Sequence, residues 1–117
     1  LNANAGNYAI ALSGANNIIG AGVTVNGGSL TLQLNNGSLS FGNNATAGSA
    51  VIISNSIYEG LHFFGNGTAA DASIMVNSNA VTFWESSSAG NATITTQSGA
   101  YSFYYDSSSG GNSRQII

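Results

Sequence analysis

The sequence predicts an all-β protein, a β-solenoid (β-helix) of about five rungs with a period of roughly 20–22 residues, in which residues 1–117 form a single domain. Short segments of alternating apolar and polar residues recur at nearly constant spacing, and clusters of Gly, Asn and Ser separate them. Such alternation is typical of strands with one buried face, and these three residue types favour turns. The chain also contains no proline, which suits a backbone whose N–H groups are committed to ladders.

The first recurring segment is centred on a phenylalanine. Its four copies read NGSLSFGNN, EGLHFFGNG, NAVTFWESS and GAYSFYYDS, and their central residues are Phe41, Phe63, Phe83 and Phe103, at sequence steps of 22, 20 and 20. Stacked rungs lie about 4.8 Å apart, so equivalent residues lie directly above one another. We therefore expect these four rings to point inward and to form one aromatic ladder, in which each pair contributes roughly 0.5–1.5 kcal/mol beyond its burial.

The second recurring segment lies between copies of the first and carries a pair of apolar residues. The pairs are Leu30/Leu32, Ala50/Ile52, Ala72/Ile74 and Ala92/Ile94, at sequence steps of 20, 22 and 20. Ile10 precedes Leu30 by one such step, which predicts that Ile10 belongs to the same row in the first rung. At the other end, the same alignment places Gln115 in the row of Ile94, where it would be a poor core residue.

Charge is unusually scarce in this chain. Charged residues make up 4% of the sequence, against roughly a quarter in ordinary domains. Arg114 is the only strong base, beside Glu59, Asp71, Glu85 and Asp106, which argues against nucleic acid as a partner. The hydrophobic content of 43% argues against disorder. No cysteine is present, and no apolar run approaches the ~18 residues that span a bilayer, so we expect no membrane insertion.

Few residues are candidates for chemistry. Glu85 and Asp106 are expected at equivalent positions one rung apart, near Trp84 and Tyr104, and we interpret them as solvated turn residues. The alternative is a sugar-binding or sugar-cleaving site built on the two carboxylates. The single histidine, His62, is expected to point outward, and it has no second histidine with which to hold a metal. We therefore expect no catalytic residues, no cofactor and no metal.

Two sets of residues are candidates for an interface. Four aromatic residues form an outward stripe in the expected register: Phe64, Trp84, Tyr104 and Tyr105. Exposed apolar stripes often mark interaction sites, although a longer loop or a third strand could equally cover this one. The second set is the apolar C-terminus, Ile116 and Ile117.

Residues 10–34 read IALSGANNIIGAGVTVNGGSLTLQL, which resembles the autotransporter-associated β-strand repeat, L-T-L-S-G-x-N-x-Y-x-G-x-T-x-V-x-G-G-x-L-x-L. The matching residues are Leu12, Ser13, Gly14, Asn16, Gly20, Val25, Gly27, Gly28, Leu30 and Leu32. Ile18 replaces the usual Tyr. The units TAGSAVI, TAADASI, SAGNATI and SGGNSRQ resemble the S-x-A-G-N-A-T-I units that follow such repeats in bacterial surface proteins. We therefore divide the domain into autotransporter-like first rungs, 1–34, and AGNATI-like rungs, 35–117.

This resemblance implies a right-handed β-helix within a large secreted or surface-anchored bacterial protein. The chain begins with Leu1 and carries no signal peptide, so we interpret it as a mature or excised piece of a longer product. The leading hypothesis is a non-enzymatic structural module: a stalk, an adhesin segment or a fibre subunit. The alternative is a β-helix that binds or cleaves carbohydrate, with a glycan or host surface as its partner. Ice binding would need regular outward threonine rows, and Thr24, Thr31, Thr82 and Thr93 are too scattered.

The two ends of the predicted solenoid show no cap. Neither end has an amphipathic helix, a proline or a charged terminal rung, devices that normally protect open strand edges. We therefore expect copies of the chain to stack head to tail, or the ends to join adjacent repeats of the same polypeptide.

Overall fold

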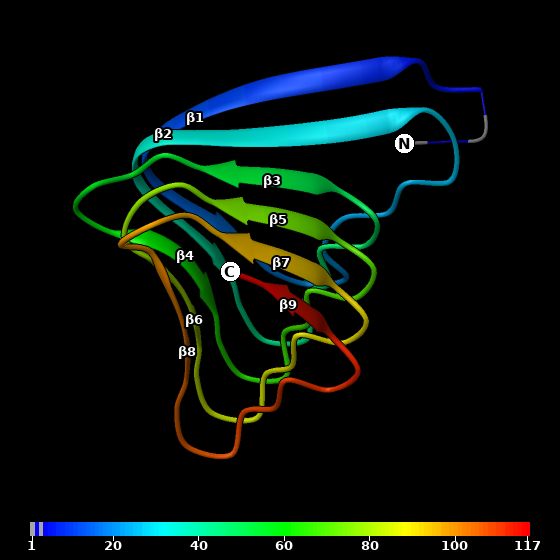
Figure 1. The fold of residues 1–117 in the computed structure, drawn as a ribbon. Coiled ribbons are helices and arrows are strands. Elements are labelled where there is room, and N and C mark those ends of the chain that lie inside the picture. Colours follow the sequence, from blue (N-terminus) through cyan, green and yellow to red (C-terminus); the bar gives the residue numbers. More distant parts are fainter. Residues whose placement is uncertain (1, 3) are drawn as a thin grey trace.

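Parallel pairing between strands of successive turns organises the chain (Figure 1). The computed structural model describes residues 2 and 4–117, so positions 1 and 3 of the predicted domain lie outside the described residues. The strands are β1 (Asn7–Ile18), β2 (Ser29–Phe41), β3 (Val51–Ser54), β4 (Gly60–Phe63), β5 (Ser73–Val76), β6 (Ala80–Phe83), β7 (Thr93–Thr96), β8 (Tyr101–Tyr104) and β9 (Arg114–Ile116). No helix occurs in this described part, and hence none that could cross a membrane.

Two ladders diverge from the long strand β2. The first half of β2 pairs with β3, and this ladder continues through β5 and β7 to β9. The second half of β2 pairs with β4, and this ladder continues through β6 to β8. Single bridges stack along a third side of the coil, at Gly22, Thr46, Thr68, Ser88 and Ser109. The chain is therefore a β-solenoid of about five turns, which confirms the predicted fold.

Inward side chains from all three sides fill the core. The β3 ladder contributes the row Leu32, Ile52, Ile74 and Ile94, and the β4 ladder contributes Leu39, Leu61 and Val81, all of them buried. The rings of Phe41, Phe63 and Phe83 are fully buried and stack with centroids 4.9 and 4.8 Å apart. The third side contributes small side chains, among them Ala47, Ala69 and Ala89. The three buried phenylalanines therefore form the ladder expected from the sequence.

The last turn departs from that expectation, because Phe83 pairs and stacks with Tyr104 rather than with Phe103. The turn between β7 and β8 has four residues, 97–100, whereas the equivalent turn between β5 and β6 has three, 77–79. A shift of one residue moves every side chain of a strand to the opposite face. The prediction was therefore wrong for both residues: Tyr104 points inward, and Phe103 lies on the outer surface with 40% of its area exposed.

The first turn also differs in register. Ile10 lies opposite Leu32, and Tyr8 takes the position opposite Leu30 that we had expected for Ile10. Ile10 belongs to the first turn as predicted, but it is exposed because no earlier turn of the described chain covers it. At the other end, Gln115 does lie opposite Ile94, as the alignment predicted.

Candidate functional site

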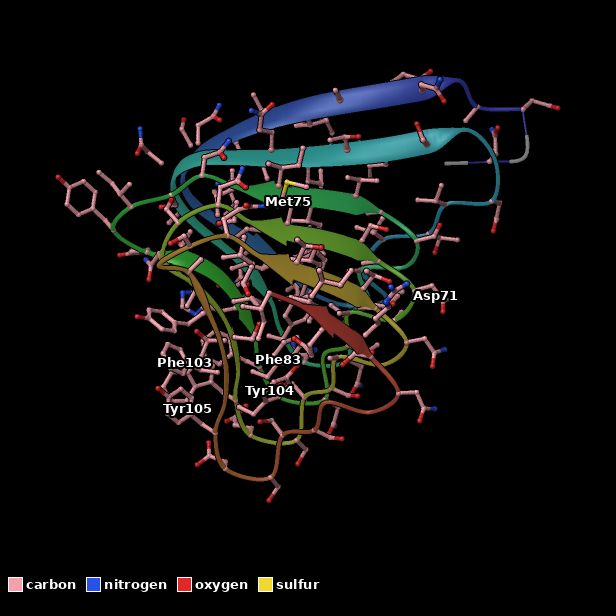
Figure 2. All side chains as sticks on the ribbon, in the orientation of Figure 1. Asp71, Met75, Phe83, Phe103, Tyr104 and Tyr105 are labelled. Carbon is pink, nitrogen blue, oxygen red and sulfur yellow. The ribbon has the colours of Figure 1, made fainter. Side chains whose placement is uncertain are left out.

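A stack of aromatic rings runs along the outside of the β4 ladder. Phe64, Trp84 and Tyr105 follow one another in successive turns, with ring centroids 6.3 and 4.3 Å apart. These are three of the four residues of the predicted outward stripe. The fourth, Tyr104, lies instead beside Phe83 in the inner column, as Figure 2 shows.

The outer stack is extended along β8 by two residues that sequence analysis did not assign to it. Phe103 lies 5.5 Å from Tyr101 and 5.9 Å from Tyr105, measured between ring centroids. Tyr101 and Tyr105 expose 57% and 42% of their area, so the final turn presents three adjacent aromatic side chains to solvent. The signal that would have placed them outside is the extra residue in the turn before β8, because it reverses the two faces of that strand.

The rings of the outer stack lie nearly parallel, which decides what they can bind. The plane of Trp84 is inclined by 11° to Phe64 and by 19° to Tyr105, so Trp84 has a ring against each of its faces. A sugar that packs on an aromatic residue uses the face of the ring. The centre of this stack therefore offers ring edges, whereas Tyr101, Phe103 and Tyr105 of the final turn are exposed.

His62 lies on the same outer surface, between the inward residues Leu61 and Phe63, as predicted. Its ring stacks on Phe64 with centroids 5.8 Å apart, and its Nδ1 atom is shielded from solvent and has no hydrogen-bond partner among the described residues. Burial lowers the pKa of His62, and the charge of Glu59 opposes this shift in part. This half-buried position makes protonation of the imidazole less favourable than it is in water.

Glu85 and Asp106 occupy equivalent corners of successive turns, as expected, and each adopts a left-handed backbone conformation with φ of 57°. The Glu85 carboxylate accepts a hydrogen bond from the N–H of Gly65 at 2.5 Å. In the same way, Asp106 Oδ2 accepts from the N–H of Glu85 at 3.1 Å. Each carboxylate therefore binds the backbone of the preceding turn, which is a structural use of both groups.

Other polar side chains form similar ladders between turns. Asn77 Nδ2 donates to Asn55 Oδ1 at 2.7 Å, and Asn66 Nδ2 donates to Asn44 Oδ1 at 3.2 Å. Across the residues that the structure describes, no three His, Cys, Asp or Glu side chains gather in a group that could hold a metal ion. These polar ladders thus hold neighbouring turns together along the length of the coil.

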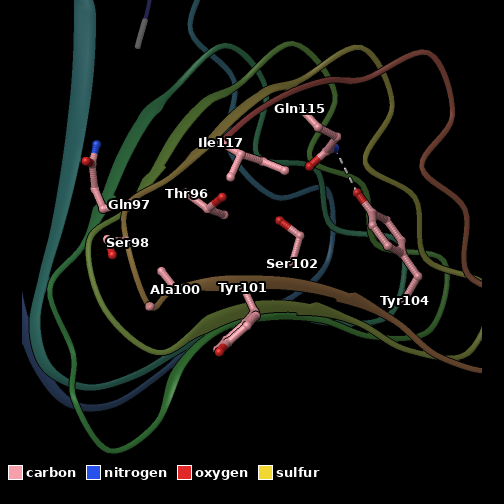
Figure 3. Close-up of a pocket in the computed structure, with 10 residues that line it drawn as sticks. Thr96, Gln97, Ser98, Ala100, Tyr101, Ser102, Tyr104, Gln115 and Ile117 are labelled. Carbon is pink, nitrogen blue, oxygen red and sulfur yellow. Dashed lines mark hydrogen bonds between the residues drawn. The ribbon is translucent and has the colours of Figure 1, made fainter.

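A cavity of about 550 Å³ opens at the C-terminal end of the coil (Figure 3). Its lining consists of Thr96, Gln97, Ser98, Gly99, Ala100, Tyr101, Ser102, Tyr104, Gln115 and Ile117. The amide of Gln115 spans part of the opening and donates to the Tyr104 hydroxyl at 3.0 Å. Burial raises the pKa of that hydroxyl, and hydrogen bonds to Ser113 and Gln115 oppose the shift.

The outer face of the β3 ladder is largely apolar, with a shallow hollow of about 130 Å³ between β3, β5 and β7. Its outward residues include Val51, Ile53 and Met75, and among these described strands a Thr-x-Thr pair occurs only in β7, at Thr93 and Thr95. Because the neighbouring strands do not repeat that pair, the face lacks the regular threonine rows that ice binding would need.

Comparison of the chain with protein-family models, curated proteins and solved structures finds no significant match.

Proposed function

We propose that this chain is a non-enzymatic structural β-solenoid of a bacterial extracellular or cell-surface protein, acting as a fibre subunit or as a stalk or adhesin segment. The observation that carries the proposal is the unbroken column Phe41, Phe63, Phe83 and Tyr104, in which each ring lies 4.8–4.9 Å from the next. A continuous stack of rings along the axis of the coil favours a stiff, elongated structure. The resemblance of residues 10–34 to autotransporter repeats is the reason for a bacterial surface location.

The use of the carboxylates supports a role without catalysis. Glycosidases need two carboxyl groups that face one substrate across a gap. Here Glu85 and Asp106 each accept a hydrogen bond from a backbone N–H of the previous turn. Both groups are thus engaged in holding neighbouring turns together, which favours a framework over an active site.

The ends of the coil support assembly. Within the described chain, one edge of β1 and one edge of each of β8 and β9 carry no neighbouring strand. Residues 1–58 contain no charged side chain, so little electrostatic repulsion opposes contact at the N-terminal end. Head-to-tail contacts between unlike surfaces generate open filaments when the rotation between copies does not close a ring, as in stacking along the axis of the coil.

Electron micrographs and sedimentation of the purified chain at micromolar concentration test the fibre role. We expect filaments, or a mass distribution that grows with concentration. A dispersed monomer with intact strand structure would rule out self-assembly of this chain. It would leave the stalk role, in which the same column lies within one polypeptide.

Glycan binding is the second candidate function, and the aromatic residues exposed on the final turn favour it. Tyr101, Phe103 and Tyr105 form a continuous outward group with open ring area. Titration with a panel of oligosaccharides, monitored by intrinsic fluorescence, tests this role. Phe103→Ala should then weaken binding. If the chain cleaves an oligosaccharide and Glu85→Gln abolishes this cleavage, both candidate functions are wrong and the protein is an enzyme.

A further inference from the structure

The turn between β3 and β4 carries an apolar tip, Ile57 and Tyr58, that the core does not use. This turn has five residues, 55–59, whereas the equivalent turns before β6 and β8 have three and four. Ile57 and Tyr58 expose 62% and 81% of their areas. In Figure 1 the green loop between β3 and β4 extends past the turns that follow it. The Tyr58 side chain has no hydrogen bond or ring contact within the described residues.

Hydrogen bonds from both neighbouring turns hold the base of the tip. Ser56 is fully buried, and its hydroxyl donates to the carbonyl oxygen of Gly37 at 2.8 Å and accepts from the N–H of Gly37 at 3.2 Å. From the following turn, the Ser78 hydroxyl donates to the Ser56 carbonyl at 3.0 Å. Asn79 Nδ2 donates to the carbonyl of Glu59. A group that is fixed before it binds loses less conformational entropy on binding, so the tip is prepared for a partner.

The outer face of the β3 ladder carries a concave feature, the shallow hollow of about 130 Å³ between β3, β5 and β7. Val51, Ser73 and Thr93 lie opposite one another in one outward column. Ser73 has the smallest side chain of the three, so the column dips at β5, beside the exposed Met75 (Figure 2). None of the seven lining residues carries a charge. The hollow has the volume of about four waters, which suits a single side chain better than a drug-sized ligand.

The tip and the hollow both lie on the sides of the coil, in its middle turns. Any residues that continue the coil would stack on β8 and β9 along its axis. Such further turns would leave the outer faces of β3, β5 and β7 as they are. The two features are therefore lateral surfaces, which a neighbouring column can reach.

The charges beside the two features are opposite in sign. Glu59 directly follows Tyr58 in the tip. Arg114, the only strong base of the chain, lies opposite Thr93 in the outward column, one strand spacing (~4.8 Å) beyond the hollow. Arg114 forms no ion pair within the described residues. The chain therefore joins a convex apolar feature to a negative charge and a concave one to a positive charge, which makes it complementary to another copy of itself.

We propose that copies of this chain associate side by side, with the apolar tip of one copy seated in the hollow of the next and Glu59 beside Arg114 of that neighbour. The tip and the hollow are different surfaces, so each copy offers both and the contact can continue from copy to copy. The inference rests on the proposed structural role, because it supplies the contact that bundles neighbouring columns. One tip makes a small interface, in the weak class below about 1,200 Å², and repetition along two columns adds avidity.

Introduced cysteines test which surfaces meet, because the chain contains no cysteine of its own. Ile57→Cys marks the tip, and Ser73→Cys marks the hollow. Ser86→Cys is the matched control, since Ser86 is also an exposed serine of the middle turns but lies outside the hollow. Equimolar pairs of variants are oxidised, and mass spectrometry measures the mixed disulfides. We expect the 57–73 disulfide to exceed the 57–86 disulfide at least about fivefold, and equal yields would overturn the proposal.

Charge reversal tests the recognition between copies, with the yield of the 57–73 disulfide as its readout. Glu59→Arg and Arg114→Glu, each carried on both cysteine variants, should lower this yield about two- to fivefold, because each brings like charges together. The double variant restores an opposite pair and should recover the yield. Ser107→Arg adds a positive charge on the exposed turn after β8 and should leave the yield unchanged. A loss that the double variant fails to recover would contradict the pairing of Glu59 with Arg114.

Electron micrographs separate this inference from the fibre role. If filaments form while the 57–73 disulfide shows no excess, the side-by-side contact is wrong and the fibre role stands. If the disulfide forms in excess but no filaments appear, end-to-end assembly fails and the side-by-side contact stands. When both hold, filaments of the unmodified chain should lie in bundles, and those of Tyr58→Ser should separate into single columns. Bundles that persist in Tyr58→Ser would overturn the role of the tip.

Discussion

Tyr104 stacks on Phe83 with ring centroids 4.9 Å apart and ring planes inclined by only 5°. This contact reflects the register of the whole final turn, in which Ser102 and Tyr104 lie inside and Tyr101, Phe103 and Tyr105 lie outside. The inner column ends at the C-terminal cavity, and the outer aromatic group lies on the opposite face of the same strand. The register marked by this contact thus decides which residues form each of the two candidate surfaces.

The inner and outer columns should differ in their contribution to stability. Phe83 is fully buried with a ring on each side, so Phe83→Ala should lower the free energy of unfolding by about 3–5 kcal/mol. Tyr105→Ala is the control from the outer column and should cost much less, because that ring is substantially exposed. Urea unfolding measures both. Equal losses would show that the outer column contributes as much as the core.

The register of β8 can be tested directly by NMR. We expect nuclear Overhauser contacts between the ring protons of Tyr104 and Phe83, since those rings are in contact. Phe103 should show contacts to Tyr101 and Tyr105 and none to Phe83. Contacts between Phe103 and Phe83 would contradict this register and support the one expected from the sequence, with Phe103 inside.

A glycine at position 70 should stabilise the protein. Ala70 has a φ of 50°, and the equivalent corners of the other turns are Gly48, Gly90 and Gly111. The left-handed conformation costs an L-residue roughly 1–2 kcal/mol, which Ala70→Gly relieves, although glycine also adds entropy to the unfolded chain. We expect a net gain of up to about 1 kcal/mol, visible as a raised thermal midpoint. Ala69→Gly, at the buried neighbouring position, is the control and should destabilise.

Stability should fall as the solution is acidified below neutral pH, because of His62. Burial lowers the pKa of His62 below its ordinary value of 6.5, so the unfolded chain binds a proton more readily than the folded one. Its contribution is therefore fully present above pH 6.5 and is lost as the pH falls through the lower folded pKa. Urea midpoints between about pH 7 and 5 measure the effect above the usual range of carboxyl titration. The same series on His62→Gln should be flatter, and an unchanged slope would assign the pH dependence elsewhere.

The repeat and most of the core could be predicted from the sequence, because rows such as Ile52, Ile74 and Ile94 keep both their spacing and their chemistry. The final turn could not, since YSFYY places an aromatic residue on each face of the strand. Alternation alone favoured Tyr101 and Phe103 inside, with no serine in the core. The structure instead turns Ser102 inward, because one added residue in the turn at 97–100 fixes the phase of the strand. The residues of both candidate surfaces depend on the phase of β8, so only some of them could be predicted from the sequence.

The hydrogen bonds of Glu85 and Asp106 give the coil a direction. Each carboxylate reaches back to a corner made one turn earlier in the chain, so the N–H of Gly65 finds its acceptor only after Glu85 is in place. Likewise, the N–H of Glu85 finds its acceptor only after Asp106 is in place. A chain that emerges from its N-terminus, whether from a ribosome or through a membrane pore, would complete each corner only when the following turn docks. Shortening the protein from its C-terminus should therefore loosen the last remaining corner as well as remove the turn beyond it.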